Sequence, residues 1–514
     1  MYIAPNSDIW LCSGIPFDMS YDNTKLYPNK EAQFTDISSK ALLHLTDLSY
    51  IREESEIMID ASPAILYKCN YIIFKNTNFE NRYFYAFITG FRYINNDCYG
   101  VKYTIDVFQT WMFDYTMKSC FIDRAHVEDD SIGANRVPEG LETGEFCYYY
   151  ATTPPRGPYY ICVAATFDAN YNDAVGSVTN GVYSGLIIHH FTSAANANSF
   201  ISGAINAGKS DGIVSMYMAE GPGYITEATI TRTDSQQKYK PFGGYIPKNN
   251  KLYTYPYTFL TVTNNNGNAA NYRWEEFNNN QAATFKIYSS DTLQPDLLLV
   301  PTGYNTEYGN TSDNTTGMMY LGGFPQCSWN VDTYKAWLAQ NANTLYFTEA
   351  MAKVEIAVGA VNMGIGLFGG GTFGSGLNQV VSGAKAIGEL EAAKRDKDIL
   401  APQARVVSGS RDITYMAGYC MFTFYRMSIR EEFAKKIDDY FTRYGYAVHE
   451  MGVPNLSSRE SYNYIRTVGC LITAQCPADD ALQIQQIYDK GITIWHVDLD
   501  DIGDYTLSND PVVG

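Results

Sequence analysis

Residues 356–384 contain no charged side chain, and this stretch limits what the rest of the chain can be. Its length is sufficient to cross a hydrocarbon core of about 30 Å. Glycine is frequent, however, and two asparagines and a glutamine interrupt the apolar residues, so an ordinary transmembrane helix is not expected. Two apolar arms, residues 356–368 and 377–387, flank a glycine turn at residues 369–371. This arrangement predicts a long apolar hairpin loop.

Small residues recur at every fourth position in this stretch, at Gly366, Gly370 and Gly374, and the spacing permits close packing between backbones. An oligomer can bury several such loops in a central lumen and release them later, whereas a buried helical hairpin or a mobile core loop is the simpler alternative. The residues expected to interact with a membrane are the larger apolar side chains: Ile356, Val358, Val361, Met363, Ile365, Leu367, Phe368, Phe373, Leu377, Val380 and Val381.

Residues 364–369 spell GxGxxG, the pattern of a dinucleotide-binding turn. Such a turn must open a helix whose N-terminus meets the pyrophosphate. The residues that follow, 370–376, are rich in glycine and do not favour a helix. The pattern therefore does not predict a cofactor site.

Other catalytic and metal-binding patterns are also missing from the sequence. His189 and His190 are adjacent on a predicted strand, so they point to opposite faces and do not easily chelate one ion. The ten Cys are spread singly, which favours reduced and mostly buried thiols. The acidic residues at 498–504 lack the Gly and the distal Glu of a calcium-binding EF-hand loop. We predict no catalytic, cofactor or metal site, and hence no enzyme.

The net charge of −18 argues against a protein that holds nucleic acid, because contacts to phosphate need Lys and Arg. An acidic wall is nevertheless suited to letting DNA pass without binding it. The charged share of 18% is low and the aromatic share of 15% is high, which fits a protein that buries surface against partners. Residues 1–10 carry no secretory signal, so we expect synthesis in a cytoplasm.

The first part of the chain, residues 1–150, is predicted to form a β-rich domain. Runs of aromatic and β-branched residues at 71–75, 83–94 and 101–113 are separated by turn residues and predict an antiparallel meander. The middle part, residues 151–343, is predicted to mix strands and loops. Its candidate strands are residues 159–167, 185–191 and 212–218, with a weak helix at 195–207.

Residues 344–405 are predicted to hold the apolar loop and its flanking helices, and residues 406–514 an α+β domain. A strand at 415–426 precedes Ser428 and Glu431, which have the spacing of a capping box and predict that a helix starts there. Gly445 is the expected end of that helix. A second helix is expected between Pro477 and Gly491. With strands at 446–453, 467–473 and 492–495, the order is that of a ferredoxin-like βαββαβ unit.

Short segments in both halves of the chain form a specific combination. In the C-terminal half they are residues 420–425, 438–441, 444–446, 453–455, 463–464, 477–480, 491–496 and 502–505. In the N-terminal half they are residues 74–78, 85–89, 105–111, 126–127 and 133–145. Together they resemble the tail-knob proteins of small short-tailed phages, over roughly residues 65–150 and 410–505. Residues 155–340 match no motif of that family.

The resemblance implies a virion protein that forms a homohexameric tube at the distal end of the tail. It implies neighbours in the tail, namely a proximal tail tube and a tip or cap protein, and a lumen through which genomic DNA passes without specific binding. It also implies that the apolar loops plug the tube and later form a pore in the host membrane. The alternative functions are a receptor-binding adhesin using residues 155–340, a wall-degrading enzyme and a secreted pore-forming toxin.

Overall fold

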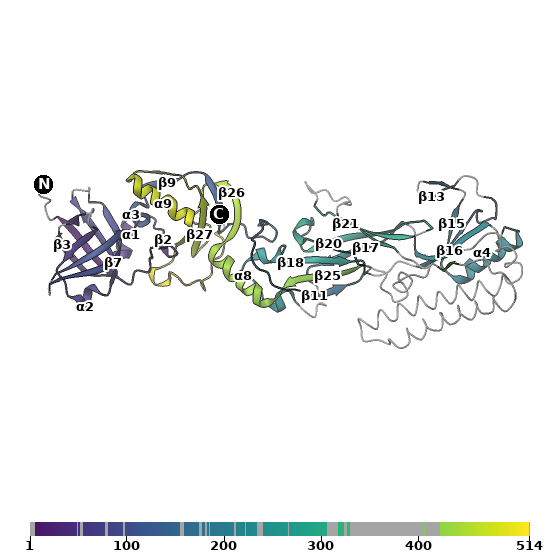
Figure 1. The fold of residues 1–514 in the computed structure, drawn as a ribbon, viewed down its shortest axis with the longest axis horizontal. Helices are drawn as coiled ribbons and strands as arrows, with labels where there is room; N and C mark the ends of the chain where they lie inside the picture. The colour runs from purple at the N-terminus through teal and green to yellow at the C-terminus, as the bar shows by residue number, and fades with distance from the viewer. Residues whose placement is uncertain are drawn as a thin grey trace. The chain divides into compact units, whose positions relative to one another are not determined.

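The computed structural model describes most of the chain outside residues 329–421. It covers residues 6–512 except for 49, 52–54, 78–80, 96–97, 155–158, 174–176, 180–181, 185, 210–211, 222, 234–239, 266, 294, 306–316, 323–325, 329–404 and 407–421. Strands predominate among these residues, and helices are fewer (Figure 1). The predicted class, mainly β with α+β parts, is confirmed at this level.

The chain divides into two compact units, and both are discontinuous in sequence. Unit 1 consists of Met1–Glu142, Ile246–Leu252 and Glu432–Gly514, and unit 2 of Thr143–Tyr245 and Tyr253–Glu431. Residues from the two ends of the chain share one hydrophobic core in unit 1, where Ile9 and Ile72 belong to the same cluster as Ile484. The division into four consecutive segments stays a prediction, but the first and last of those segments contribute to one core.

The larger sheet of unit 1 has seven strands in the order β3-β1-β6-β7-β8-β5-β4. The strands are β1 Ser7–Ser13, β3 Ala41–Leu48, β4 Tyr50–Ile51, β5 Glu56–Ile59, β6 Cys69–Asn76, β7 Tyr83–Asn95 and β8 Cys98–Ile105, and helices α1 Lys30–Ser38 and α2 Pro63–Leu66 accompany them. The predicted meander is confirmed, because β7 pairs antiparallel with both β6 and β8. Its last strand is shorter than predicted and ends at Ile105, because Asp106 caps the short helix α3, Val107–Trp111.

The second sheet of unit 1 has five strands in the order β2-β29-β27-β10-β26. They are β2 Thr24–Lys25, β10 Cys120–Ala125, β26 Tyr446–Gly452, β27 Tyr462–Val468 and β29 Ile492–Trp495. Helices α8 Glu431–Tyr444 and α9 Ala478–Lys490 and the small strand pair β9 Tyr115–Met117 and β28 Ile472–Ala474 complete this region. Strand β10 comes from the N-terminal part of the chain and lies between two C-terminal strands.

The predicted ferredoxin-like unit is wrong in its sheet, and the order of elements along the chain is only partly right. In place of the single strand predicted at 467–473, the chain forms two strands, β27 and β28. Strand β25, Thr423–Ile429, should have been its first strand, but it pairs with strands of unit 2. The position between β26 and β27 is taken by β10, which pairs antiparallel with both. Sequence order does not determine which strand fills a sheet when a distant strand has a matching register.

The capping box predicted at Ser428 and Glu431 is also wrong. Ser428 and Ile429 still belong to β25, where Ile429 pairs with Phe146 on β11, and the helix begins only at Glu431. The Ser428 hydroxyl accepts a hydrogen bond from the backbone N–H of Phe242 instead, at 3.3 Å. Ser428 and Ile429 are both buried at the end of β25. Their burial outweighs the local preference for a helix start.

The end of α8 and both ends of α9 agree with the sequence. Gly445 has a φ of 61°, and its N–H bonds the Phe441 carbonyl at 2.9 Å. A Cβ at Gly445 would lie 2.3 Å from the Ala125 carbonyl oxygen, so this position requires glycine. Helix α9 follows Pro477 and ends before Gly491, as predicted.

Unit 2 is built from sheets that the sequence only partly indicates. One sheet has the order β11-β25-β18-β19 and another β17-β20-β21-β22; the strands are β11 Phe146–Thr152, β18 Thr258–Thr263, β19 Ala269–Tyr272, β17 Gly223–Thr231, β20 Ala282–Ser289, β21 Asp296–Thr302 and β22 Met319–Gly322. The alternation of buried and partly exposed residues along β20 sends Phe285 and Ile287 into a core around Trp274. This is the period of two that a half-buried strand requires.

The third main sheet of unit 2 confirms the strands predicted in its N-terminal part. Its order is β15-β12-β16-β23-β24, with β12 Tyr159–Ala165, β15 Ile187–Phe191, β16 Ile213–Glu220, β23 Gln326–Ser328 and β24 Arg405–Val406; the pair β13 Ser177–Thr179 and β14 Val182–Ser184 stands apart from it. Helix α4, Ala194–Asn206, agrees with the weak helix predicted at 195–207 and packs Phe200 and Ile201 into the core of this sheet.

Candidate functional site

The eleven apolar residues predicted to meet a membrane all lie in residues 329–404, outside the described residues. The predicted apolar loop therefore stays a prediction. Among the residues that the structure describes, none of the helices is both long and apolar enough to cross a membrane. The site that the structure does show is a set of buried polar contacts in unit 1, which join segments far apart in the sequence.

His189 and His190 lie on β15, as predicted, and each has its own partner. His189 Nε2 is 2.9 Å from the Phe167 carbonyl, and His190 Nε2 is 3.1 Å from the Asp291 carboxylate. No group of three or more His, Cys, Asp or Glu side chains with the geometry of a metal site occurs among the described residues. Eight cysteines of the described part of the chain are free thiols: Cys12, Cys69, Cys98, Cys120, Cys147, Cys162, Cys470 and Cys476.

Asp106, in the family-like segment 105–111, lies at the centre of the first buried cluster. Its side chain is fully buried and accepts hydrogen bonds from the Tyr71 hydroxyl at 2.8 Å and the Gln109 backbone N–H at 3.0 Å. The bond from Gln109 caps α3. Burial raises the pKa of Asp106 to about 6, and the hydrogen bonds oppose this shift only in part.

The Gln109 amide joins two further segments. Its Nε2 donates to Thr24 Oγ1 at 2.9 Å and to the Lys25 carbonyl at 2.8 Å, which attaches α3 to β2. Its Oε1 accepts from Gln33 Nε2 on α1 at 2.8 Å. Thr110 beside it exchanges two hydrogen bonds with the backbone of Tyr85. Residues 105–111 thus connect the larger sheet to α1 and to β2.

Trp111 connects this segment to the C-terminal part of the chain. The indole Nε1 donates to Asp480 Oδ2 at 2.9 Å, and Asp480 is buried in the first turn of α9. The sequence alone accounts for an acidic residue at position 480, because acidic side chains are favourable near a helix N-terminus. The second role of Asp480, as an acceptor for a residue of the N-terminal part, has no local sequence signal.

Glu139 is the centre of the second cluster and belongs to the family-like segment 133–145. It forms ion pairs with Lys251 and Arg124, and the side chains of the three residues are only 1%, 2% and 6% exposed, respectively. Glu139 Oε1 also accepts from the Ala447 backbone N–H at 2.9 Å. Burial lowers the pKa of Lys251, and the neighbouring Glu139 carboxylate acts in the opposite direction.

The short segment Ile246–Leu252 is attached to unit 1 by Asp438 as well. Asp438 is buried on α8 and accepts from the backbone N–H groups of Lys248 and Asn249, at 2.8 and 3.0 Å. The Asn249 side chain adds a bond to the same carboxylate at 2.8 Å. Residues 246–252 lie between two segments of unit 2 in the sequence but belong to unit 1. These contacts explain why they do so. Sequence analysis missed them because the partners lie in separate regions.

His126, at the end of β10, is held as a neutral imidazole. Its Nδ1 accepts from the Tyr464 backbone N–H at 2.7 Å, so the proton resides on Nε2, which donates to the Thr442 carbonyl at 3.1 Å. A second proton on Nδ1 would face the N–H of Tyr464. Burial, with a smaller contribution from the charge of Arg459, lowers the pKa of His126 to about 3.

The low pKa of His126 predicts an acid-sensitive contribution to the stability of unit 1. The contribution is complete above about pH 6.5, the ordinary pKa of His in the unfolded chain, and is lost as the pH falls toward 3. We expect the stability difference between the wild type and His126→Asn to change by on the order of 4 kcal/mol between pH 7.5 and pH 3.5, with the wild type losing more. Urea unfolding at both pH values measures this difference.

The matched control for this prediction is His449→Asn. The His449 side chain is 49% exposed on β26 and pairs with Asp123 near the surface. Its substitution leaves the contacts of His126 in place and should change the stability at pH 7.5 by less than about 1 kcal/mol. Groups common to the compared proteins, such as Asp106, cancel in the differences. Parallel acid dependence of the wild type and His126→Asn would contradict the assignment.

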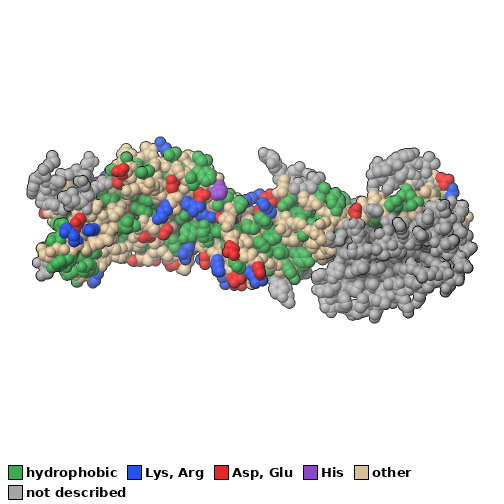
Figure 2. All heavy atoms as spheres, viewed as in Figure 1, with side chains coloured by type: hydrophobic (Ala, Val, Ile, Leu, Met, Phe, Trp, Pro, Cys, Tyr) green, Lys and Arg blue, Asp and Glu red, His purple; other side chains and the backbone are tan. Residues whose placement is uncertain are grey.

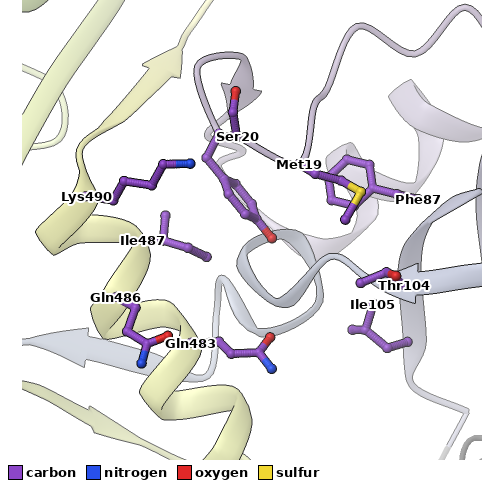
Figure 3. Close-up of a pocket in the computed structure, with 10 residues that line it drawn as sticks. Met19, Ser20, Phe87, Thr104, Ile105, Gln483, Gln486, Ile487 and Lys490 are labelled. Atoms are coloured by element: carbon purple, nitrogen blue, oxygen red, sulfur yellow. The ribbon is translucent and has the colours of Figure 1, made fainter. Parts of the chain in front are cut away.

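The described part of unit 1 contains two cavities that are large enough to hold a small molecule. The smaller, of about 270 Å³, is shown in Figure 3. Met19 and Ser20 of the loop after β1, Phe87 of β7 and Ile487 of α9 are among the residues around it. Its described lining contains no carboxylate, His or Cys, so the hydroxyl and amine groups that it does hold, such as those of Ser20 and Lys490, have no general base beside them in that lining. The larger cavity is described below.

The face of the molecule drawn in Figure 2 has no continuous basic tract over the described residues. On the side shown in Figure 2, Lys and Arg side chains lie among Asp and Glu side chains instead of forming one basic tract. This distribution agrees with the net charge of −18.

Comparisons with known proteins identify what kind of structure this is. A family model described as Bacillus phage phi29, tail knob protein gp9, C-terminal domain, matches residues 224–510, and a model of the Caudoviral major tail protein N-terminus matches residues 5–116. Tail knob protein gp9 of Bacillus phage B103 is 25% identical over 98% of both chains, and gp9 of Bacillus phage phi29 is 23% identical over 98% of both.

A solved structure has the same fold. The tail knob protein gp12 of bacteriophage C1 superposes with a TM-score of 0.64 at 12% sequence identity, covering 98% of this chain and 100% of that one. The gp9 family model alone spans more than half of the chain, and the predicted resemblance is thereby confirmed. The chain belongs to the family of phage tail knob proteins represented by gp9 of phage phi29, and it is a structural component of the virion tail and not an enzyme.

Proposed function

We propose that this tail knob protein assembles as a homohexameric tube through which the phage genome leaves the virion. Membership in the tail knob family is the observation that carries the proposal. The net charge of −18 supports it, because an acidic lumen does not hold DNA by its phosphates. The tube would contact a proximal tail tube protein on one side and a tip or cap protein on the other.

Unit 1 has the properties that a rigid wall of such a tube needs. Its two sheets share one core, and the Asp106 and Glu139 clusters fix segments from the beginning, middle and end of the chain. Buried ion pairs and side-chain hydrogen-bond networks favour one defined arrangement over alternatives. A wall of this kind can stay intact while other parts of the molecule move.

We assign the membrane-active role to the apolar stretch, residues 356–384. In this proposal the loops of six copies first plug the lumen and then enter the host membrane. The absence of charge over the whole stretch supports the second step, because each charged residue at a bilayer centre costs about 2.5 kcal/mol or more. The glycines and the three amide side chains disfavour a single spanning helix. They favour a hairpin whose copies act together.

The oligomeric state tests the central proposal. We expect native mass spectrometry of the purified protein to give a mass near six times 57.6 kDa. Electron microscopy of the same sample should show rings with a central channel. A protein that remains strictly monomeric at micromolar concentration, in the presence and absence of lipid, would contradict the tube. Cell binding that needs residues 155–340 but not a ring would favour a receptor-binding adhesin.

A further inference from the structure

The larger cavity of unit 1 has a volume of about 700 Å³ and a polar lining. Three separate parts of the chain form its wall: the loop after β10, the crossing segment around residues 248–250, and the C-terminal residues 506–511. Arg459, which lies three residues before β27, and Tyr462, the first residue of β27, line it as well. The cavity is large enough for a small polar ligand or for a side group of a larger one.

Arg459 is a buried cation that forms no close ion pair among the described residues, and the Asp130 carboxylate of the same cavity interacts with its charge only from a longer distance. The residue is only 7% exposed, and its Nε is completely buried without a hydrogen bond. Its guanidinium makes one long hydrogen bond, from Nη1 to the Asn509 carbonyl at 3.3 Å. Within the described part of the chain no carboxylate forms an ion pair with it. A buried charge without a partner is costly, so its presence at a cavity wall indicates an occupant.

The backbone around Arg459 is held firmly, which keeps the guanidinium in place. The Arg459 N–H donates to Asn463 Oδ1 at 2.9 Å, and Arg459 forms a β-bridge with Pro511. Next to it, the N–H of Ser461 donates to Asn509 Oδ1 at 2.9 Å. A donor that is fixed before binding loses little entropy when a ligand arrives.

The acidic groups of the cavity are already occupied by other donors. Its three carboxylates accept hydrogen bonds from neighbouring side chains: Asp130 from the Tyr446 hydroxyl at 2.5 Å, Asp510 from the Ser508 hydroxyl at 2.8 Å, and Glu128 from the Asn455 amide. His126 on the same wall is neutral, as its two hydrogen bonds require. The exposed Lys248 at the rim adds a second positive charge.

We propose that this cavity binds an oxyanionic group, a phosphate or a carboxylate, through the guanidinium of Arg459 with Lys248 at the rim. The planar donors of a guanidinium match the oxygens of either group, and an ammonium at the rim attracts anions without fixing their geometry. The proposal is independent of the hexameric tube, because every residue that it uses lies in unit 1 of a single chain.

The test is a thermal unfolding series of the full-length protein with inorganic phosphate or acetate as the probe. Each titration is matched in ionic strength with chloride, so that screening is the same. The wild type should melt at least about 2 °C higher at saturating concentration of the better anion. Phosphate and acetate are run separately, and the larger shift tells which chemistry the site prefers.

Arg459→Gln is the decisive variant, and Arg466→Gln is its control. Arg466 is a partly exposed arginine on β27, and it pairs with Asp123. In chloride alone, Arg459→Gln should be at least as stable as the wild type, and it should lose the anion-dependent shift. Arg466→Gln should keep the full shift. General stabilisation by phosphate appears equally in all variants and is thereby subtracted.

A purely structural role for Arg459 gives the opposite pattern. Arg459→Gln would then melt below the wild type in chloride, and the wild type would show no anion-specific shift; this pattern overturns the proposal. If Arg459→Gln fails to fold, calorimetric titration of the wild type and of Lys248→Gln decides. The exposed Lys248→Gln substitution should weaken anion binding about two- to fivefold, and no measurable binding to the wild type rejects the site.

Discussion

Replacing Glu139 by glutamine is expected to lower the free energy of unfolding of the tail knob protein by about 3–5 kcal/mol. The amide keeps the size of the side chain but removes the charge that compensates Lys251 and Arg124. Both cations lie in unit 1 with side chains only 2% and 6% exposed, so water cannot replace the carboxylate. Urea unfolding at neutral pH, followed by circular dichroism, measures the loss.

A matched control and a rescue make this prediction specific. Glu145→Gln removes the same charge from an exposed pair, where the side chains of Arg430 and Glu145 are 55% and 78% exposed, and should change stability by less than about 1 kcal/mol. Combining Glu139→Gln with Lys251→Met should cost less than the sum of the two single substitutions, because the stranded charge is gone. Strict additivity would show that the cluster does not act as a unit.

Deleting residues 359–383 is expected to abolish leakage from liposomes while the rings still assemble. In our proposal these residues enter the membrane but contribute nothing to the buried clusters of unit 1. Release of an encapsulated dye measures the pore, and electron microscopy of the same sample measures assembly. Unchanged leakage from the deleted protein would remove this stretch from the mechanism.

Single substitutions separate an effect of apolarity from an effect of length. Leu367→Lys introduces a charge into the first apolar arm, with an insertion cost of about 3 kcal/mol per copy, and should reduce leakage strongly. Asn378→Gln keeps an uncharged amide in the second arm and should leave leakage near that of the wild type. Equal leakage from both variants would argue against insertion of the arms into the bilayer.

The features of the fold that follow from local sequence could be predicted. Helix α9 begins after Pro477 and ends before Gly491, because the fixed φ of proline and the positive φ of 106° at Gly491 act within one turn. The strands β6 and β7 were recognised from aromatic and β-branched runs separated by turn residues. These signals depend on neighbours only a few residues away.

The pairings that build the two units could not be predicted from one sequence. Strand β25 reads as the first strand of a C-terminal unit, yet its neighbours are β11 and β18. From the sequence, Asp438 is expected on the polar face of an amphipathic helix. In the structure it is buried and accepts hydrogen bonds from the backbone N–H groups of residues 248 and 249. Nothing within a helix reveals a partner supplied by a distant loop.

The candidate site shows the same limit. The segments 105–111 and 133–145 were singled out only by resemblance, and the structure gives them physical roles through Asp106 and Glu139. The cavity at Arg459 has no sequence signal, because its three walls come from three regions of the chain. The apolar stretch was found readily because an uncharged run is visible without any knowledge of contacts.

The discontinuity of unit 1 has a consequence for how the protein is synthesised. Its core needs Ile484 and Ile492 from the last part of the chain, so the N-terminal strands cannot complete their packing while the ribosome is still adding residues. The whole of unit 2 is translated between the parts of unit 1. Unit 1 therefore closes only after the whole of unit 2 has been translated, and fragments that end before residue 484 should aggregate instead of joining a tail.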